Sequence, residues 1–217
     1  MGHAMARKRS HPAYSSNRPR FWGRHAVAAA LDNPNRRVLR AWATREGAAL
    51  MNFPPDVPVT FADVADLGRL VPNDAPHQGL VIEVDPLEDI WLADVLGDAP
   101  EKAILLVLDQ VTDPHNVGAI LRSAAAFAVK AIVTTARHSP EATGVLAKSA
   151  SGALEMVPIV TVQNLARALG ELNDQGFLTV GLDSEGSTDL AAVELRQPLA
   201  LVLGVAFLGL ELHDFSG

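Results

Sequence analysis

The sequence predicts an α/β protein of two domains, the second built on a mostly parallel β-sheet. From Ala103 onward, short apolar runs alternate with segments whose apolar residues recur at helical spacing, a pattern typical of strands and helices in a doubly wound sheet. The preceding part of the chain shows a shorter alternation of the same kind and a different charge. With 217 residues, 48 % of them hydrophobic, the chain is long enough to form two cores.

Charge is distributed unevenly along the chain. Residues 1–45 carry a formal net charge of +9 and residues 46–217 one of −16, against −7 for the whole chain. A basic N-terminal part on an acidic body favours contact with nucleic-acid phosphates through the first domain. A basic tail without such a role, or an expression leader in Met1–Met5, is the alternative.

Composition also excludes some classes of protein. The chain has no cysteine, so disulfides and thiolate metal sites are excluded and a reducing cytoplasm fits. Neither a signal peptide nor an apolar run long enough to span a bilayer is found. We therefore expect a soluble cytoplasmic protein that contacts no membrane, and we identify no metal site.

The first domain is expected over residues 21–85, after a disordered basic arm over 1–20 and before a linker over 86–102. Its elements are a helix over 21–31 that stops at Asn33-Pro-Asn35, strands over 38–44, 57–60 and 79–84, and a helix over 62–70. Trp22 at the first helix is more typical of a core residue than of a residue that stacks on a base, although both remain open.

The second domain is expected over residues 103–217. Its strands are placed at 104–108, 131–134, 156–160, 178–182 and 199–203. Its helices are placed at 117–127, 141–148, 162–173 and, as a short segment, 190–193.

The segment Leu108–Phe127 joins a buried strand to a polar loop and a helix. Asp113-Pro114 indicates a turn, and we expect Asn116 to cap the helix. Gly118 in the first turn costs roughly 1 kcal/mol relative to alanine, which indicates close approach by another backbone or by a ligand. Helical side chains lean toward the N-terminus, so Arg122 can reach back toward the loop. An ordinary capped helix with a solvated arginine is the alternative.

Two strand ends offer a further candidate site. Gly181-Leu-Asp183 and Leu201–Gly204 both end strands of the predicted parallel sheet, and a doubly wound sheet binds ligands at the carboxyl ends of its strands. Glycine at such ends can also serve the turn alone.

Three segments resemble a known family. The run Asn116-Val-Gly-Ala-Ile-Leu-Arg122, within Leu108–Ala124, resembles the first signature of the SpoU (TrmH) family of RNA 2′-O-methyltransferases. The segment from Lys148 to Glu155, with its Ser-Gly-Ala-x-Glu run, is similar to a second family segment, although Ser-Gly is also a common helix terminator. The opening of the first domain and His77-Gln-Gly-Leu80 look like the L30e-like substrate-binding domain that precedes the catalytic domain in many SpoU enzymes.

The resemblance implies a methyltransferase site. It implies S-adenosylmethionine as cofactor at Leu182, Asp183, Leu203 and Gly204, and catalytic roles for Asn116, Arg122 and Glu155. It also implies RNA as the partner, contacted by Arg18, Arg20 and Arg24, and a homodimer. The context is most similar to members that methylate a guanosine of 23S ribosomal RNA, with transfer RNA as the alternative substrate.

Arg122 is expected to act through its charge. Removing a proton from a guanidinium at pH 7 costs roughly 8 kcal/mol, so we expect Arg122 to stabilise the developing 2′-alkoxide rather than to act as a base. Asn116 would hold the loop. No metal is needed for this reaction.

The chain departs from the family after its last predicted strand. The second signature usually runs Gly-x-Glu-Gly-x-Gly, but here Gly204 is followed by Val-Ala-Phe-Leu-Gly209, with Ala206 at the glutamate position and Phe207 at a glycine position. No third signature precedes Gly217. We therefore expect a SPOUT-type domain that lacks its C-terminal knot segment, binds the cofactor weakly or not at all, and dimerises less firmly.

Two other classes of protein remain open. A non-catalytic RNA-binding remnant is favoured by the altered second signature. A generic nucleotide-binding protein of the doubly wound class is disfavoured, because no G-x-G-x-x-G or Walker sequence follows any predicted strand.

Overall fold

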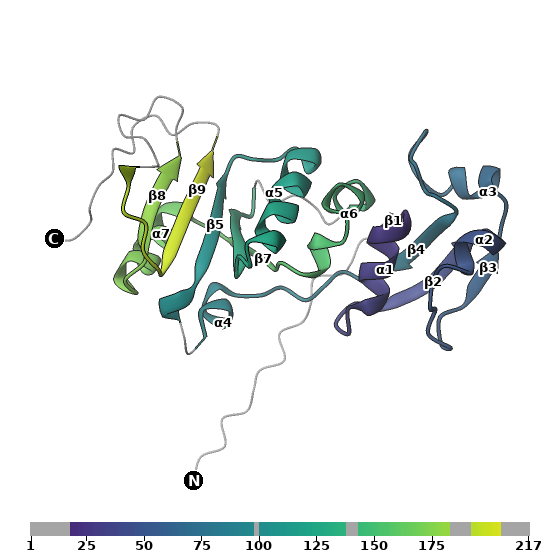
Figure 1. The fold of residues 1–217 in the computed structure, drawn as a ribbon, viewed down its shortest axis with the longest axis horizontal. Coiled ribbons are helices and arrows are strands. Elements are labelled where there is room, and N and C mark those ends of the chain that lie inside the picture. Colours follow the sequence, from purple (N-terminus) through teal and green to yellow (C-terminus); the bar gives the residue numbers. More distant parts are fainter. Residues whose placement is uncertain (1–17, 98–99, 138–142, 183–191, 205–217) are drawn as a thin grey trace, which may run out of the picture.

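A computed structural model describes residues 18–97, 100–137, 143–182 and 192–204 (Figure 1). The first domain consists of β1 Arg20–Trp22, α1 Arg24–Asp32, β2 Val38–Ala43, α2 Arg45–Ala48, β3 Val59–Phe61, α3 Val64–Gly68 and β4 Leu80–Val84. Its strands form a mixed sheet in the order β1-β4-β2-β3, in which only the β2 and β3 pair is parallel. Every residue of β4 is buried, so this strand forms the centre of the first core.

The start of the first domain differs from the prediction. Residues 20–22 form a strand rather than the end of a disordered arm and the start of a helix, because β1 pairs antiparallel with β4 and places Phe21 opposite Ile82. Gly23 follows with φ 84°, and the helix begins only at Arg24. Trp22 is 5 % exposed, which confirms the core interpretation of this residue.

The second domain contains eleven elements among the described residues. They are α4 Leu92–Leu96, the 3₁₀ turn η1 Pro100–Lys102, β5 Ile104–Asp109, α5 Pro114–Ala126, β6 Ala131–Thr135, α6 Gly144–Ala150, the 3₁₀ turn η2 Ala153–Glu155, β7 Ile159–Val162, α7 Leu165–Asp174, β8 Leu178–Leu182 and β9 Leu199–Gly204.

The described strands of the second domain form one sheet in the order β7-β6-β5-β9-β8, and each neighbouring pair is parallel. This confirms the predicted α/β class with a parallel sheet. The chain moves outward from β5 to β7 and then crosses to the other edge, so β5 and β9 are neighbours at the point where the strand order reverses. That point is where ligands bind in open α/β sheets.

The predicted linker over 86–102 is not a simple linker. It contains α4, whose Val95 and Leu96 are buried against the core of the second domain. This short helix was not predicted because it has only five residues, in a segment rich in acidic residues and without a clear apolar period.

Several boundaries in the second domain are displaced from the prediction. The third strand begins at Ile159 rather than at Met156, because the Pro158 carbonyl accepts from Ile132 N–H (2.9 Å) just before the ladder starts. Helix α7 begins after Asn164, whose side chain accepts from Arg167 N–H (3.0 Å), and not at Val162. Helix α6 begins after its cap, Thr143, and the preceding residues 141–142 lie outside the described part, as do residues 190–191 of the helix predicted at 190–193.

The two domains share one apolar cluster. We call the contact of α1 and β1 with α6 and η2 the seam (Figure 1). At its centre a Cβ on Gly144 would lie 1.8 Å from the Trp22 ring and 2.1 Å from the Arg20 carbonyl oxygen, so β1 packs directly on the α6 backbone. Farther along, a Cβ on Gly152 would lie 3.0 Å from Ala29 Cβ of α1. Small residues on α6 and η2 therefore allow the first domain to dock closely on the second.

Among the described residues, none of the helices is long and apolar enough to pass through a membrane.

Candidate functional site

Helix α5 begins at the carboxyl end of β5 with an aspartate cap. Asp113 accepts from His115 N–H (3.0 Å), and Pro114 occupies the first helical position. The prediction that Asn116 is the cap is therefore wrong. Proline suits the first position because its ring presets the helical φ and it lacks an N–H that would be left unpaired there, so the helix starts three residues earlier than predicted. Asn116 lies exposed in the first turn.

Gly118 allows α6 to approach α5 closely. A Cβ at this position would lie 2.4 Å from Ser149 Oγ and 2.9 Å from Ala150 N. Ser149 Oγ also donates to the His115 carbonyl oxygen (3.3 Å) in the first turn of α5. The expected compensation for this glycine is confirmed, and it is close packing against the Ser149 side chain and the Ala150 backbone of α6.

Arg122 is exposed, and its Nη1 donates to the Ser149 carbonyl oxygen of α6. Ser149 also contacts the first turn of α5, so the guanidinium points back toward the N-terminus of its own helix. Val117 and Leu121 of α5 belong to the cluster against which Leu203 of β9 packs. The start of α5 thus shares its packing with the end of β9.

Glu155 is not available to a substrate. Its carboxylate accepts from Arg36 Nη2 (2.8 Å) and Nε (3.1 Å) and from Asn33 Nδ2 (2.6 Å), and the Arg36 and Glu155 side chains are 1 % and 4 % exposed. The expected catalytic role of Glu155 is therefore replaced by a structural one. Sequence reasoning could not find this pair because Arg36 lies 119 residues away in the other domain.

Ser151 and Gly152 end helix α6. Both have left-handed backbone conformations, with φ 49° and 94°, and Gly152 turns the chain against α1. The interpretation of Ser-Gly as a helix terminator is confirmed.

The ends of β8 and β9 lie at the carboxyl edge of the sheet. Leu182 pairs with Leu203, and Gly204 pairs with Asp109 at the end of β5. All three candidate cofactor residues in this region, Leu182, Leu203 and Gly204, are half-buried. Asp183 lies outside the described residues, as do Ala206 and Phe207 with the rest of 205–217.

The three candidate RNA-binding arginines have different surroundings. Arg18 Nε lies 3.4 Å from an Asp85 carboxylate oxygen. Arg20 donates to the Leu70 carbonyl oxygen (3.1 Å) and lies 3.7 Å from the buried carboxylate of Glu83. The guanidinium of Arg24 makes no hydrogen bond or ion pair with any described residue, so of the three it is the one with a free charge.

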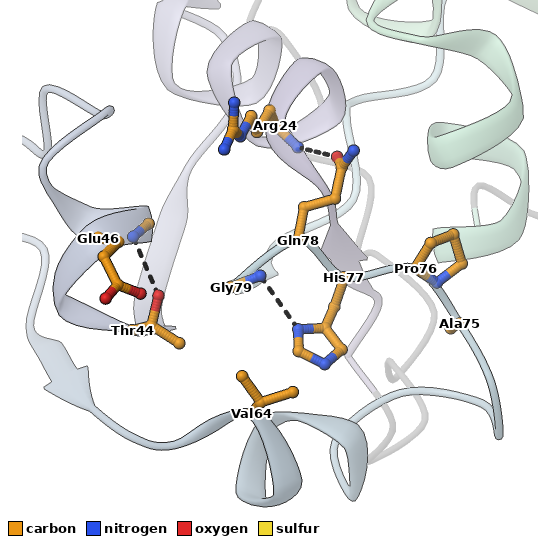
Figure 2. A pocket seen from close by; sticks show the side chains of 10 residues that line it. Arg24, Thr44, Glu46, Val64, Ala75, Pro76, His77, Gln78 and Gly79 are labelled. Carbon is orange, nitrogen blue, oxygen red and sulfur yellow. Dashed lines mark hydrogen bonds between the residues drawn. The ribbon is translucent and has the colours of Figure 1, made fainter.

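Arg24 lies beside a cavity that sequence reasoning missed. The cavity measures about 540 Å³ and is shown in Figure 2. It is lined by Arg24, Thr44, Glu46, Gly47, Val64, Ala75, Pro76, His77, Gln78 and Gly79. The signal in the sequence was His77-Gln-Gly, which the family resemblance noted but which no periodicity connects to Arg24 or Glu46.

Gln78 links this cavity to the second domain. Its Oε1 accepts from Arg24 N–H and from Lys148 Nζ of α6, each at 3.0 Å. Partial burial against the first domain lowers the pKa of Lys148, because desolvation disfavours the ammonium. The position of the cavity relative to α6 is therefore held by a specific contact.

The fold and these contacts define a class of protein, a two-domain α/β protein in which a small mixed-sheet domain is docked on a parallel-sheet domain. Residues 103–211 match the SpoU rRNA Methylase family, and residues 21–90 match the RNA 2′-O ribose methyltransferase substrate-binding family. The chain belongs to the SpoU family, whose members are S-adenosylmethionine-dependent RNA 2′-O-methyltransferases.

Relatives match most of the chain. The 23S rRNA (guanosine-2′-O-)-methyltransferase RlmB of Neisseria meningitidis is 38 % identical, over 87 % of this chain and 78 % of that protein. The RlmB of Vibrio parahaemolyticus is 36 % identical, over 85 % and 78 %. An uncharacterized tRNA/rRNA methyltransferase of Synechocystis is 35 % identical over 88 % of this chain, which spans only 52 % of that relative.

Solved structures share the fold. A putative RNA methyltransferase of the TrmH family from Porphyromonas gingivalis superposes with a TM-score of 0.67 at 25 % identity, over 85 % of this chain and 71 % of that one. The SpoU methyltransferase AviRb from Streptomyces viridochromogenes, solved with AdoMet, has a TM-score of 0.65 at 21 % identity, over 88 % and 75 %, a likeness of fold alone.

Proposed function

We propose that this protein methylates the ribose 2′-hydroxyl of a guanosine in 23S ribosomal RNA. The observation that carries the proposal is the similarity to RlmB proteins, which extends through both domains and over 78 % of the length of those relatives. A transfer RNA substrate is the second candidate, favoured by the similarity to the Synechocystis tRNA/rRNA methyltransferase.

The carboxyl edge of the parallel sheet suits an adenosyl group. Leu182 and Leu203 are half-buried apolar side chains at the ends of adjacent strands, and Gly204 ends the strand that neighbours β5. We assign these residues, with Asp183, to S-adenosylmethionine, which supplies an electrophilic methyl group when bound.

Helix α5 carries the residues that we assign to the 2′-hydroxyl. Attack by a 2′-hydroxyl requires alignment with the methyl donor and stabilisation of the oxygen as it loses its proton. Arg122 is a fixed cation for that oxygen or the adjacent phosphate, because its hydrogen bond to Ser149 orients it while leaving the other donors exposed. Asn116, exposed in the first turn of the same helix, is the second residue of α5 that we assign to this site.

Substitution of Arg122 tests this role. The altered second signature predicts weak cofactor binding, so transfer is measured at high S-adenosylmethionine concentration. Under that condition we expect Arg122→Ala to lower methyl transfer to 23S rRNA transcripts by at least roughly 100-fold, the effect of removing one such charge-stabilising donor, without further lowering cofactor affinity. Transfer of a radiolabelled methyl group measures the first and calorimetry with S-adenosylmethionine the second. The matched control is Arg167→Ala, which removes an exposed arginine on α7 whose only ion-pair partner among the described residues is Glu171.

The outcomes separate the parts of the proposal. Transfer retained by Arg122→Ala would reject the role of this residue. Transfer by the parent chain to transfer RNA but not to 23S rRNA would favour the second candidate, and transfer to neither RNA would reject the proposed function.

We also propose that the protein acts in the cytoplasm as a homodimer. The absence of cysteine suits a reducing compartment. Phe127, at the end of α5, is 77 % exposed, and a large apolar side chain in that position supports an interface between copies. Light scattering on the purified chain gives its mass in solution, and a monomer at micromolar concentration would contradict the dimer.

A further inference from the structure

We propose that the cavity beside His77 receives one unpaired base of the RNA substrate and selects guanine. This inference rests on the proposed function, since it concerns how the substrate-binding domain holds its RNA. The family match over residues 21–90 assigns substrate binding to this domain as a whole, and the inference adds the cavity and the base that it would receive.

The cavity is built on a rigid backbone. Gln78 and Gly79 both have left-handed φ values, 55° and 78°, and the Gly79 carbonyl oxygen accepts from Thr44 N–H (2.9 Å). A Cβ on Gly47 would lie 2.4 Å from that same oxygen, so α2 packs against the turn without a side chain between them. The walls are therefore in place before a ligand arrives, which lowers the cost of binding.

His77 presents a hydrogen-bond donor to the cavity. The residue is 9 % exposed, and its Nδ1 accepts from Gly79 N–H (3.2 Å), as Figure 2 shows. A neutral imidazole that accepts at Nδ1 carries its proton on Nε2. No described residue accepts a hydrogen bond from Nε2, so the donor is free for a ligand.

The other lining groups suit a base better than a phosphate. Val64, Ala75 and Pro76 provide an apolar wall, and the carboxylate of Glu46, which has no ion-pair partner among the described residues, would repel a phosphate. The unpaired guanidinium of Arg24 lies among the lining residues and can hold a phosphate next to the inserted base. Unpaired RNA bases are commonly recognised in this way, splayed out and hydrogen-bonded along their Watson–Crick edges.

Guanine is the base whose edge matches the polar groups. Its N1–H and N2–H donors can pair with the Glu46 carboxylate, and its O6 can accept from His77 Nε2–H. Adenine would place its N1 acceptor against the carboxylate, and uracil has one edge donor where guanine has two. One correct bidentate contact changes base preference by roughly tenfold.

The first experiment measures base preference with the full chain. The probes are fluorescent eleven-nucleotide RNAs of uridine with a central guanosine, adenosine, cytidine or uridine, and binding is followed by anisotropy. We expect the guanosine RNA to bind roughly tenfold tighter than the other three. Glu46→Gln, a change at an exposed position, should reduce this preference to less than about threefold, because the amide replaces one of the two acceptor oxygens with an NH2 donor that faces a guanine donor.

Two results would overturn the proposal. One is equal binding of all four RNAs by the parent chain. The other is an equal gain in affinity for all four RNAs in Glu46→Gln, which would mean that the carboxylate only repels the phosphate backbone.

A second experiment uses a matched pair of variants. Val64 and Leu50 are exposed apolar residues of the first domain, 64 % and 53 % exposed, but only Val64 lines the cavity. Val64→Glu and Leu50→Glu make the same charge change, so we expect only Val64→Glu to abolish the guanosine preference. Equal effects of the two variants would reject the cavity as the site. Methyl transfer by the parent chain is measured in parallel, so that active enzyme without base preference rejects this inference and leaves the proposed function standing.

Discussion

The seam between the domains and the carboxyl edge of the parallel sheet place charged residues in opposite environments. At the seam, Arg36 and Glu155 are almost fully buried and bind each other through several hydrogen bonds. On helix α5, which starts from that edge, Arg122 is exposed and makes one hydrogen bond to a backbone oxygen. Both arginines are held in place, but only Arg122 retains donors for a substrate.

The difference shows how to separate structural charges from functional ones. A buried charge must be paired, and once all its partners are protein groups it has nothing to offer a ligand. The motif around Glu155 predicted a catalytic role, but its buried ion pair with Arg36 indicates a structural one. Arg122 and Arg24 remain candidates because solvent still reaches guanidinium N–H groups that no atom of the described residues accepts from.

The largest expected effect comes from breaking the buried pair. Glu155→Ala leaves Arg36 buried without a counter-charge, so we expect the free energy of unfolding to fall by about 3–5 kcal/mol, measured by urea denaturation. The control is the double variant Arg36→Met with Glu155→Leu, which removes both charges and should restore most of the loss. A single variant as stable as the parent would show that the seam is open in solution.

A smaller effect is expected from filling the close contact at the seam. Gly144→Ala would place a methyl group inside the Trp22 ring, so we expect a loss of about 1–3 kcal/mol from overpacking. The matched control is Gly170→Ala on α7, where no described residue outside the helix lies within 4 Å of the added Cβ and alanine should stabilise the helix by roughly 0.5–1 kcal/mol. If both variants moved the unfolding midpoint in the same direction, close docking of β1 on α6 would be contradicted.

The smallest effect concerns the interior of the parallel sheet. Thr134 on β6 is 0 % exposed, and its hydroxyl has no hydrogen-bond partner among the described residues. Thr134→Val removes a buried polar group at nearly constant shape, so we expect a gain of about 1 kcal/mol in thermal and urea unfolding. A loss of stability would indicate that the hydroxyl has a partner in the folded protein and that this part of the sheet is more polar than its neighbours suggest.

Local patterns in the sequence predicted the strands and the longer helices of the second domain. Apolar runs at Ile104–Leu108 and Leu199–Leu203 predicted two strands that the structure places side by side, and the spacing from Val117 to Leu121 predicted α5. Strand β1 and helix α4 were missed because each is short and is stabilised by a distant segment. Strand β1 pairs with β4, and α4 packs on the core of the second domain, so neither contact is visible in the local sequence.

The sequence by itself determined the parallel sheet, the helix that carries Arg122, and the glycine at 118 that required a close neighbour. Periodicity and turn chemistry act over a few residues, so they can be read directly from the chain. Only the tertiary structure decided that Glu155 forms an ion pair with Arg36 and that Trp22 packs against Gly144. It also decided that Arg24, Glu46 and His77 line one cavity. These outcomes depend on burial and on contacts between distant segments, which exist only after the two domains have packed.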